Sequence, residues 1–270
     1  MATESMVLPT GVTVEYELVG PPGAPVLCFV HGVGASMEQF QSQVAHFSGR
    51  YRVLRLSHRG HGRSGEPPAS KPEAYTPRAL ADDLQAVLDE LGIDELHFVG
   101  NSLGGLVGYE LLKIRHPALR SFTTFGATAE LHTSKVKYWM VVGSIRLFGV
   151  LFGNNAMASL LEKSGSKDRE VGAMLKRMFL CARQDALTML TKSIANYDYT
   201  PILAATDMPV LLIRGELDKE INAALSSTLA AIDRLPRGRV VSLAHAGHYA
   251  NMDTPDEFNR VLENFLEEIT

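Results

Sequence analysis

Short, nearly continuous apolar runs recur along this chain, and longer segments with apolar residues at helical spacing separate them. The first run, Val26 to Val30, has no charged residue, which is typical of a strand buried on both faces of a sheet. An earlier segment, Val12 to Val19, alternates apolar and polar residues like a half-buried strand. Strands and helices in alternation predict a parallel sheet covered by helices. Later runs of the same kind cover residues 53–56, 96–99, 122–125, 210–213 and 240–243.

Three segments carry strong helix signals, with a cap residue before the apolar repeat or a breaker after it. In the first of them, Thr76 is the expected N-cap, Pro77 lies in the first turn and Gly92 ends the helix. The last segment opens on a capping box and keeps one apolar face over four turns. The expected helices cover residues 77–91, 103–114 and 255–269.

Residues 129–207 break this rhythm. They contain no clear strand, are rich in apolar side chains and have a helical composition. We therefore expect an α/β fold in which a mostly parallel central sheet has helices on both faces, with this segment inserted as a helical cap. The predicted core then consists of residues 1–128 and 208–270.

Composition and charge narrow the class of protein. The net charge is −4 without a dense Lys/Arg cluster, so nucleic-acid binding is not expected. Two cysteines, Cys28 and Cys181, allow neither a disulfide framework nor a cysteine-rich zinc site. The N-terminus lacks a signal-peptide pattern. The most apolar stretch, 138–152, is shorter than the roughly 20 residues that span a bilayer. We expect a cytoplasmic globular protein with no membrane span.

Residues 100–104 read Gly-Asn-Ser-Leu-Gly and fit the pattern G-x-S-x-G. Chance would give roughly 0.13 such matches in a chain of this composition, so the pattern alone is only a hypothesis. Its context is stronger, because a predicted buried strand precedes it and a predicted helix follows it at once. That is the strand–turn–helix setting in which a nucleophilic serine is presented, so Ser102 is the candidate nucleophile.

A serine nucleophile needs a base, and His248 is the best-placed histidine. It follows the last predicted strand, at the end of the sheet where parallel strands place their sites. The rival is His31, which also ends a strand but precedes a glycine loop, so we interpret it as structural. We expect ordinary surface or loop roles for the histidines 46, 58, 61, 97, 116 and 132.

The base needs a carboxylate to hold its tautomer. Asp218 lies in the loop after the run 210–213, with Glu216 and Glu220 as close competitors. Glu130, which follows the strand before the insertion, is another possible position. The chain order would be serine, aspartate, histidine, as in acyl hydrolases built on a sheet of this kind.

Acyl transfer also needs two N–H donors for the developing oxyanion. The amide of Leu103, first in the helix after the serine, is one candidate. The other candidate is the amide of Val33. It lies in the loop after the first buried strand, residues 31–34, which contains Gly32 and which we call the glycine loop.

Together these motifs make the chain resemble the α/β-hydrolase fold family over nearly its full length. The resemblance includes His31-Gly32, the turn at 57–64, the residues 100–104 around Ser102, and Gly247-His248. It departs from the family at Ser57, where an aspartate is usual, and we expect the loss of a local hydrogen bond there. The family often has a proline a few residues after this aspartate, whereas residues 219–222 of this chain contain none.

The resemblance implies a serine hydrolase that cleaves an ester or lactone of a hydrophobic small molecule, without a metal or organic cofactor. Expected substrate-binding residues are Asn101, Gly32, Trp139 and Tyr249. A serine at the nucleophile position disfavours the dehalogenases and epoxide hydrolases of the family, which use aspartate there.

Two alternatives stay open. The first is a carbon–carbon bond hydrolase acting on meta-cleavage products, which would use a cap arginine, for which Arg177 and Arg183 are candidates. The second is a ligand receptor of the same fold with little turnover.

Overall fold

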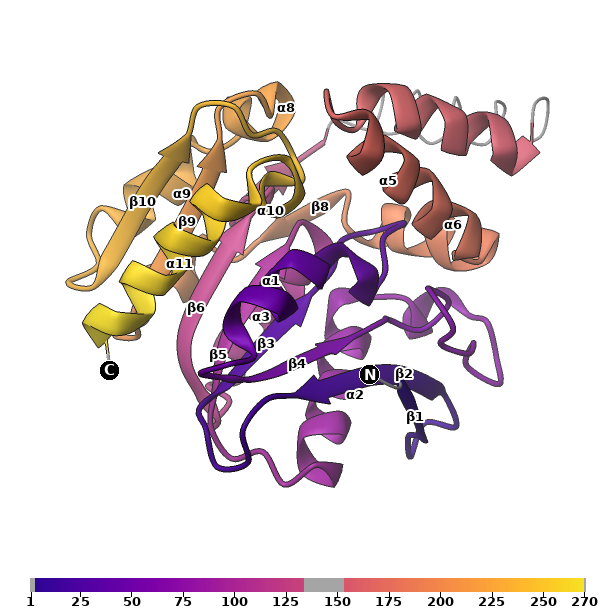
Figure 1. Ribbon diagram of the computed structural model, residues 1–270, viewed down its shortest axis with the longest axis horizontal. Helices are drawn as coiled ribbons and strands as arrows, with labels where there is room; N and C mark the ends of the chain where they lie inside the picture. The colour runs from indigo at the N-terminus through magenta and orange to yellow at the C-terminus, as the bar shows by residue number, and fades with distance from the viewer. Residues whose placement is uncertain (1–2, 134–152, 270) are drawn as a thin grey trace.

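The computed structural model describes residues 3–133 and 153–269. Its centre is an eight-stranded sheet with the strand order β1-β2-β4-β3-β5-β6-β9-β10 (Figure 1). The six strands from β4 to β10 run parallel, whereas β1 and β2 complete one edge in antiparallel pairing. The predicted sheet is therefore confirmed. The strands are β1 Glu4–Val7, β2 Thr13–Val19, β3 Val26–Val30, β4 Arg52–Leu56, β5 Leu96–Asn101, β6 Leu119–Phe125, β9 Val210–Gly215 and β10 Gly238–Leu243.

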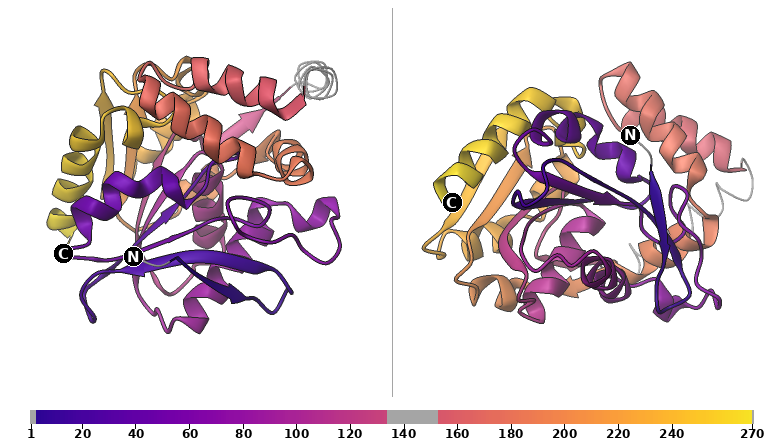
Figure 2. Two further views of the ribbon diagram at one scale, coloured as in Figure 1. Left: turned by 45° about the vertical axis from the view of Figure 1, so that its right-hand side comes forward. Right: turned by 60° about the horizontal axis from the view of Figure 1, so that its bottom comes forward.

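Helices cover both faces of the sheet, as Figures 1 and 2 show. One face carries η1 and α1 together with the C-terminal helices, and the other carries α2 and α3. Four further helical segments lie in the connections of the described chain outside residues 153–193: η2, α7, α8 and α9. The bounds are η1 Met37–Phe40, α1 Gln41–Phe47, η2 Pro72–Ala74, α2 Pro77–Glu90, α3 Leu103–Lys113, α7 Thr200–Ala204, α8 Lys219–Ala223, α9 Ser226–Ile232, α10 Ala250–Asp253 and α11 Pro255–Ile269.

The central strand β3 shows why two faces form. Its residues alternate between two cores: Cys28 belongs to the apolar cluster under α2 and α3, and Phe29 to the cluster under α1 and α11. All five of its residues are buried, as the unbroken apolar run predicts. The sheet is thus held rigid from both sides, and its strand ends offer a fixed edge for a site.

Between β6 and β9 the chain leaves the sheet, and we call residues 129–207 the insertion. Its described part contains helical residues 153–164 and the helices α5 (Arg169–Cys181) and α6 (Gln184–Ser193). Figures 1 and 2 show these helices across the carboxyl ends of the central strands.

The expectation that the insertion has no strand is wrong at its two ends. There, β7 (Glu130–His132) and β8 (Asn196–Asp198) form an antiparallel pair, in which Leu131 is opposite Tyr197. These strands are only three residues long, too short for a recognisable alternation. Trp139 and the whole apolar stretch 138–152 lie outside the described residues.

Within residues 3–133 and 153–269, no helix combines the length and the apolar character needed to cross a membrane.

Candidate active site

Ser102 lies in a sharp turn between β5 and α3. Its backbone dihedrals are φ 52° and ψ −115°, a conformation that side-chain-bearing residues rarely adopt. Glycines make the turn possible: a Cβ on Gly100 would lie 2.5 Å from the Gly104 backbone, and one on Gly104 would lie 2.1 Å from the Val30 carbonyl oxygen. The tight turn lifts Ser102 above the sheet at the N-terminus of α3, where free N–H groups favour negative charge.

The glycine loop after β3 lies directly against this serine. A Cβ on Gly32 would approach the Ser102 Cβ to 3.1 Å, a crowded contact that glycine avoids. The loop carries the Val33 amide, and α3 begins with the Leu103 amide. In the part of the chain that the structure describes, neither amide donates a hydrogen bond to the protein. Two donors are thus available near Ser102.

Asp218 and His248 meet because β9 and β10 are adjacent parallel strands, so the loops after them leave the sheet together. The Leu217 amide donates to the Ala246 carbonyl at 2.9 Å and joins the two loops. His248 Nδ1 lies 2.7 Å from Asp218 Oδ2, while the other carboxylate oxygen accepts from the Ile221 amide at 3.4 Å. A carboxylate accepts only, so His248 carries its proton on Nδ1 and leaves Nε2 as an acceptor.

The backbone of His248 is tied to the residue before the serine. Asn101 Nδ2 donates to the His248 carbonyl oxygen at 3.0 Å and to the Phe125 carbonyl at 3.2 Å. Among the described residues no hydrogen bond joins the Ser102 hydroxyl to His248. Such contacts are often long before substrate binds, so this geometry is compatible with a base that acts on Ser102.

The competing acids lie elsewhere. Glu216 and Glu220 are both exposed. Glu130 pairs with His132 Nε2 at 2.8 Å, on β7. Only Asp218 of these four carboxylates contacts His248.

Comparison with known proteins shows the family of the chain. Residues 25–255 match the family model described as alpha/beta hydrolase fold. RutD of Pseudomonas savastanoi pv. phaseolicola, a proposed carbamate hydrolase, is 30% identical over 253 residues, which cover 90% of this chain and 94% of the relative.

The chain belongs to the α/β hydrolase fold family. The predicted fold and the predicted class of enzyme, a hydrolase of this family, are thereby confirmed. A further relative, 3-oxoadipate enol-lactonase 1 of Acinetobacter baylyi, is 25% identical and covers 96% of this chain and 95% of its own. Among solved structures, the enol-lactonase from Burkholderia xenovorans LB400 superposes with a TM-score of 0.82 at 24% identity, covering 98% of this chain and 100% of that one.

The family turn at residues 57–64 corrects one expectation. Ser57 does not lose the local hydrogen bonding: its hydroxyl donates to Glu15 Oε1 at 2.6 Å and accepts from the Met37 amide at 3.1 Å. Glu15, buried on β2, also accepts from the backbone and side chain of Arg63, each at 2.9 Å. The carboxylate that the family places in the turn is thus supplied by a neighbouring strand.

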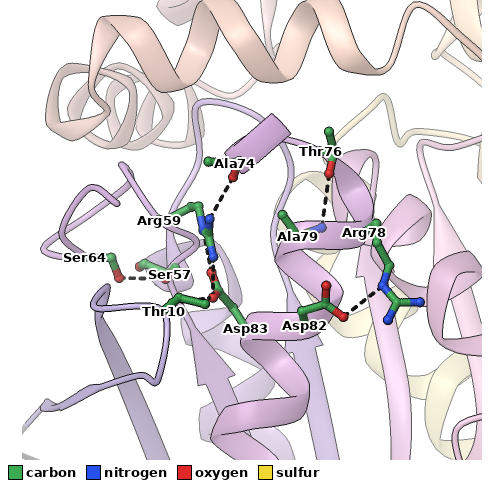
Figure 3. Close-up of polar contacts among 10 residues, drawn as sticks. All are labelled: Thr10, Ser57, Arg59, Ser64, Ala74, Thr76, Arg78, Ala79, Asp82 and Asp83. Atoms are coloured by element: carbon green, nitrogen blue, oxygen red, sulfur yellow. Dashed lines mark hydrogen bonds and ion pairs between the residues drawn. The ribbon is translucent and has the colours of Figure 1, made fainter. Parts of the chain in front are cut away.

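The same turn is anchored to α2 by an ion pair, which Figure 3 shows. Arg59 contacts both carboxylate oxygens of Asp83, at 2.7 and 2.5 Å, and donates to the Ala74 carbonyl at 2.9 Å. Both side chains are almost fully buried. Ser64 closes the turn by donating to the Ser57 carbonyl at 2.7 Å (Figure 3). The turn is therefore a rigid support next to the site.

Three histidines pack together next to the glycine loop. His58 and His61 lie in a loop, one of the two positions expected for them, but they are buried and so are not surface residues. The ring centroid of His31 lies 4.4 Å from that of His58 and 5.3 Å from that of His61. Burial lowers the pKa of His58 to about 3 and that of His61 to about 4, and it lowers the pKa of His31 as well. All three rings are neutral, so each offers one donor and one acceptor. His97 is buried too, on β5.

The predicted substrate-binding residues have different surroundings. Asn101 is fully buried, and its side-chain oxygen accepts from Gln39 Nε2 at 3.0 Å, so protein groups engage both ends of its amide. These contacts favour a supporting role over contact with substrate. Tyr249 packs with Met178 of α5 in a small apolar cluster. Gly32 faces Ser102, and Trp139 lies outside the described residues.

Arg177 and Arg183 are the candidate arginines of the carbon–carbon hydrolase alternative. Each forms an ion pair with a glutamate outside the insertion. Arg177 lies 3.5 Å from Glu38, and Arg183 lies 3.1 Å from Glu66. Both side chains are largely exposed, and both acids belong to the core. These contacts join the insertion to the core.

Across the described ranges, 3–133 and 153–269, no group of three or more His, Cys, Asp or Glu side chains is arranged to hold a metal ion.

Proposed function

We propose that this protein is a serine hydrolase that cleaves a carboxylic ester or lactone of a hydrophobic small molecule. The observation that carries the proposal is the 2.7 Å contact between His248 Nδ1 and Asp218, set beside the strained turn that presents Ser102. The relatives named as an enol-lactonase and a proposed carbamate hydrolase support hydrolysis of ester-like bonds.

The reaction follows from the positions of these groups. The Ser102 hydroxyl attacks the substrate carbonyl carbon, its proton passes to His248 Nε2, and the carbonyl electron pair moves to oxygen. The Val33 and Leu103 amides stabilise that oxyanion. When the carbonyl re-forms, the bond to the alcohol oxygen breaks and the alcohol takes the proton from His248.

Water then completes the cycle. It attacks the acyl carbon while His248 Nε2 takes its proton, and collapse of the second oxyanion returns that proton to Ser102 and releases the acid. Asp218 keeps its hydrogen bond to Nδ1 throughout and stabilises the imidazolium.

The insertion supports the choice of an apolar substrate, and we propose that residues 129–207 act as a cap. Leu175 and Met178 of α5 are buried against the core beside Tyr249, and Phe179 lies against the glycine loop. Apolar pockets with a few polar groups suit organic ligands. Each methylene buried there adds about 0.8 kcal/mol of binding.

A substrate panel tests the proposal. We expect kcat/KM to climb along p-nitrophenyl esters from acetate to hexanoate, Ser102→Ala to abolish turnover, and a fluorophosphonate to label Ser102. Labelling and turnover that persist in Ser102→Ala would overturn the assignment of the site.

The same panel separates the alternatives. It includes a lactone, an aryl carbamate and a dienol diketone. Strong turnover of the diketone with weak turnover of every ester would favour the carbon–carbon hydrolase. A single burst of product without further turnover would favour the receptor.

A further inference from the structure

We propose that His61 is a positioning residue for the oxyanion hole, because it holds the backbone of the glycine loop from below. The proposal rests on the proposed function of Ser102 and of the Val33 amide. It assigns a role in the reaction to a side chain that would otherwise count as part of the core.

Both nitrogens of the His61 ring are engaged. The Gly34 amide donates to Nε2 at 3.1 Å, and Nδ1 lies 3.1 Å from the Arg59 carbonyl oxygen. A carbonyl accepts only and an amide N–H donates only, so the proton is on Nδ1. The side chain is fully buried, which keeps this tautomer away from water.

These contacts fix the peptide groups on both sides of Val33. His61 holds the peptide that follows Val33 through the Gly34 N–H. The peptide before Val33 is held at the Gly32 carbonyl, which lies 2.7 Å from His31 Nδ1. A trans peptide is planar with its N–H opposite its C=O, so the Val33 N–H points away from the His31 ring nitrogen that contacts the Gly32 carbonyl. Holding both planes sets the direction of the proposed donor.

The glycine loop packs closely against the insertion at Gly34. Gly34 has a φ of +75°, and a Cβ there would lie 2.9 Å from Phe179 of α5. The turn that carries His61 is equally fixed, because the Arg183 amide of the insertion donates to the Gly60 carbonyl at 2.7 Å. His61 therefore links the insertion and the turn to the loop beside Ser102.

Two substitutions separate positioning from mere filling of the core. The side-chain amide of glutamine reaches the place of Nε2, so His61→Gln can still accept from the Gly34 amide. Asparagine reaches only the place of Nδ1, so His61→Asn keeps the contact with Arg59 and releases Gly34. The matched control is His97→Asn, the same change at a buried histidine at the opposite end of β5, where Nδ1 lies 2.9 Å from the Ser121 hydroxyl.

The kinetic readout uses p-nitrophenyl butyrate and the inhibitor 1,1,1-trifluoro-2-hexanone. Ser102 Oγ adds to the ketone carbon, its proton passes to His248 and the carbonyl oxygen becomes an oxyanion, so the inhibition constant reports on the oxyanion hole. Removing a donor costs about 10²–10³-fold in kcat.

If His61 positions the Val33 amide, kcat should fall about 10–100-fold in His61→Asn. The inhibition constant should rise by a similar factor, with KM within about threefold. His61→Gln and His97→Asn should keep kcat, KM and the inhibition constant close to those of the parent protein. Equal kcat values in the Gln and Asn variants, or an unchanged inhibition constant in His61→Asn, would overturn the proposal.

A second measurement does not depend on turnover or on the variants folding. Histidine-selective ¹⁵N spectra of the intact protein should show His61 protonated on Nδ1 and bare on Nε2, and the Gly34 amide should exchange slowly with solvent. The opposite tautomer, or a fast Gly34 amide, would also overturn it. If Ser102→Ala kept full activity the proposed function would fail, while this result would still decide whether His61 holds the loop.

Discussion

At the scale of single residues, Asp218 is the carboxylate whose role can be tested most directly. Asp218→Asn replaces the acceptor facing His248 Nδ1 with a group that can donate, which permits the wrong imidazole tautomer. We expect kcat to fall about 10³–10⁴-fold, measured with the best ester of the panel. Glu216→Gln, a change at an exposed neighbour, is the control and should stay close to the parent. A collapse in Glu216→Gln with near-normal Asp218→Asn would move the acid.

Glu15 and Ser57 allow a second test at the level of single residues. Glu15 supplies the carboxylate that the family usually carries at the position of Ser57. Ser57→Asp would bury a second carboxylate beside Glu15 without a new cation. An uncompensated buried charge typically costs about 3 kcal/mol, and we expect a loss of that order in urea unfolding.

The double variant Ser57→Asp, Glu15→Gln returns the site to one carboxylate. We expect its free energy of unfolding to lie within about 1 kcal/mol of the parent, since contacting residues are not additive. A double variant that loses the sum of both single effects would show that the two positions act independently.

At the scale of elements, the turn that follows α3 contains a residue that does not suit its backbone conformation. Arg115 has a φ of 51°, in the left-handed region where glycine is the usual helix terminator. The His116 amide still donates to the Leu111 carbonyl at 3.0 Å, so the terminating turn is intact.

We therefore expect Arg115→Gly to stabilise the fold by several tenths to about 1 kcal/mol. Lys113→Gly, two residues earlier and inside the helix, is the control and should destabilise by about 1 kcal/mol. Urea midpoints measure both. Destabilisation by Arg115→Gly would mean that the arginine side chain contributes more than the strained backbone takes away.

The elements themselves show where sequence reasoning succeeds. The apolar run of β3 and the strand–turn–helix around Ser102 were predictable, because burial on two faces and a tight turn restrict which residues fit. The strands β7 and β8 were not, since three residues are too few for a periodic pattern. Neighbouring strands in a parallel sheet also made the meeting of the loops carrying Asp218 and His248 predictable.

The polar interior was harder to predict. His58 and His61 are buried, and each meets a backbone group 27 residues away through Nε2, His58 at the His31 carbonyl and His61 at the Gly34 amide. No local pattern indicates such contacts. Glu15 lies on the polar side of an alternating strand, which predicted exposure. Its partner Arg63 comes 48 residues later. One available signal was the basic residue Arg55 inside an apolar run, which pairs with the neighbouring buried Glu17 at 2.7 Å.

At the scale of the whole molecule, the cluster of His31, His58 and His61 makes the free energy of unfolding depend on pH. Their pKa values in the folded protein are lowered, to about 3 for His58 and about 4 for His61. An unfolded chain titrates histidine near ~6.5 and so binds more protons below that pH. Stability is therefore fully present above about pH 6.5 and is lost as the pH falls toward the folded values.

We expect the free energy of unfolding to drop by up to about 1.4 kcal/mol per pH unit for each buried histidine below pH 6.5. Urea titrations between pH 5 and 7.5 measure this slope. His61→Gln should make this slope shallower, because it removes one of the three buried rings. A stability that is flat across this range would contradict neutral burial of the three rings.

The pairing of β7 with β8 has a consequence for how relatives of this chain can diverge. The strand that leaves the sheet after β6 and the strand that returns before β9 are hydrogen-bonded neighbours, with Glu130 opposite Asp198. A segment joined through such a pair can be lengthened, shortened or exchanged by recombination without shifting the register of any strand in the large sheet. Selection on ligand preference and selection on folding can then act on separate stretches of one gene.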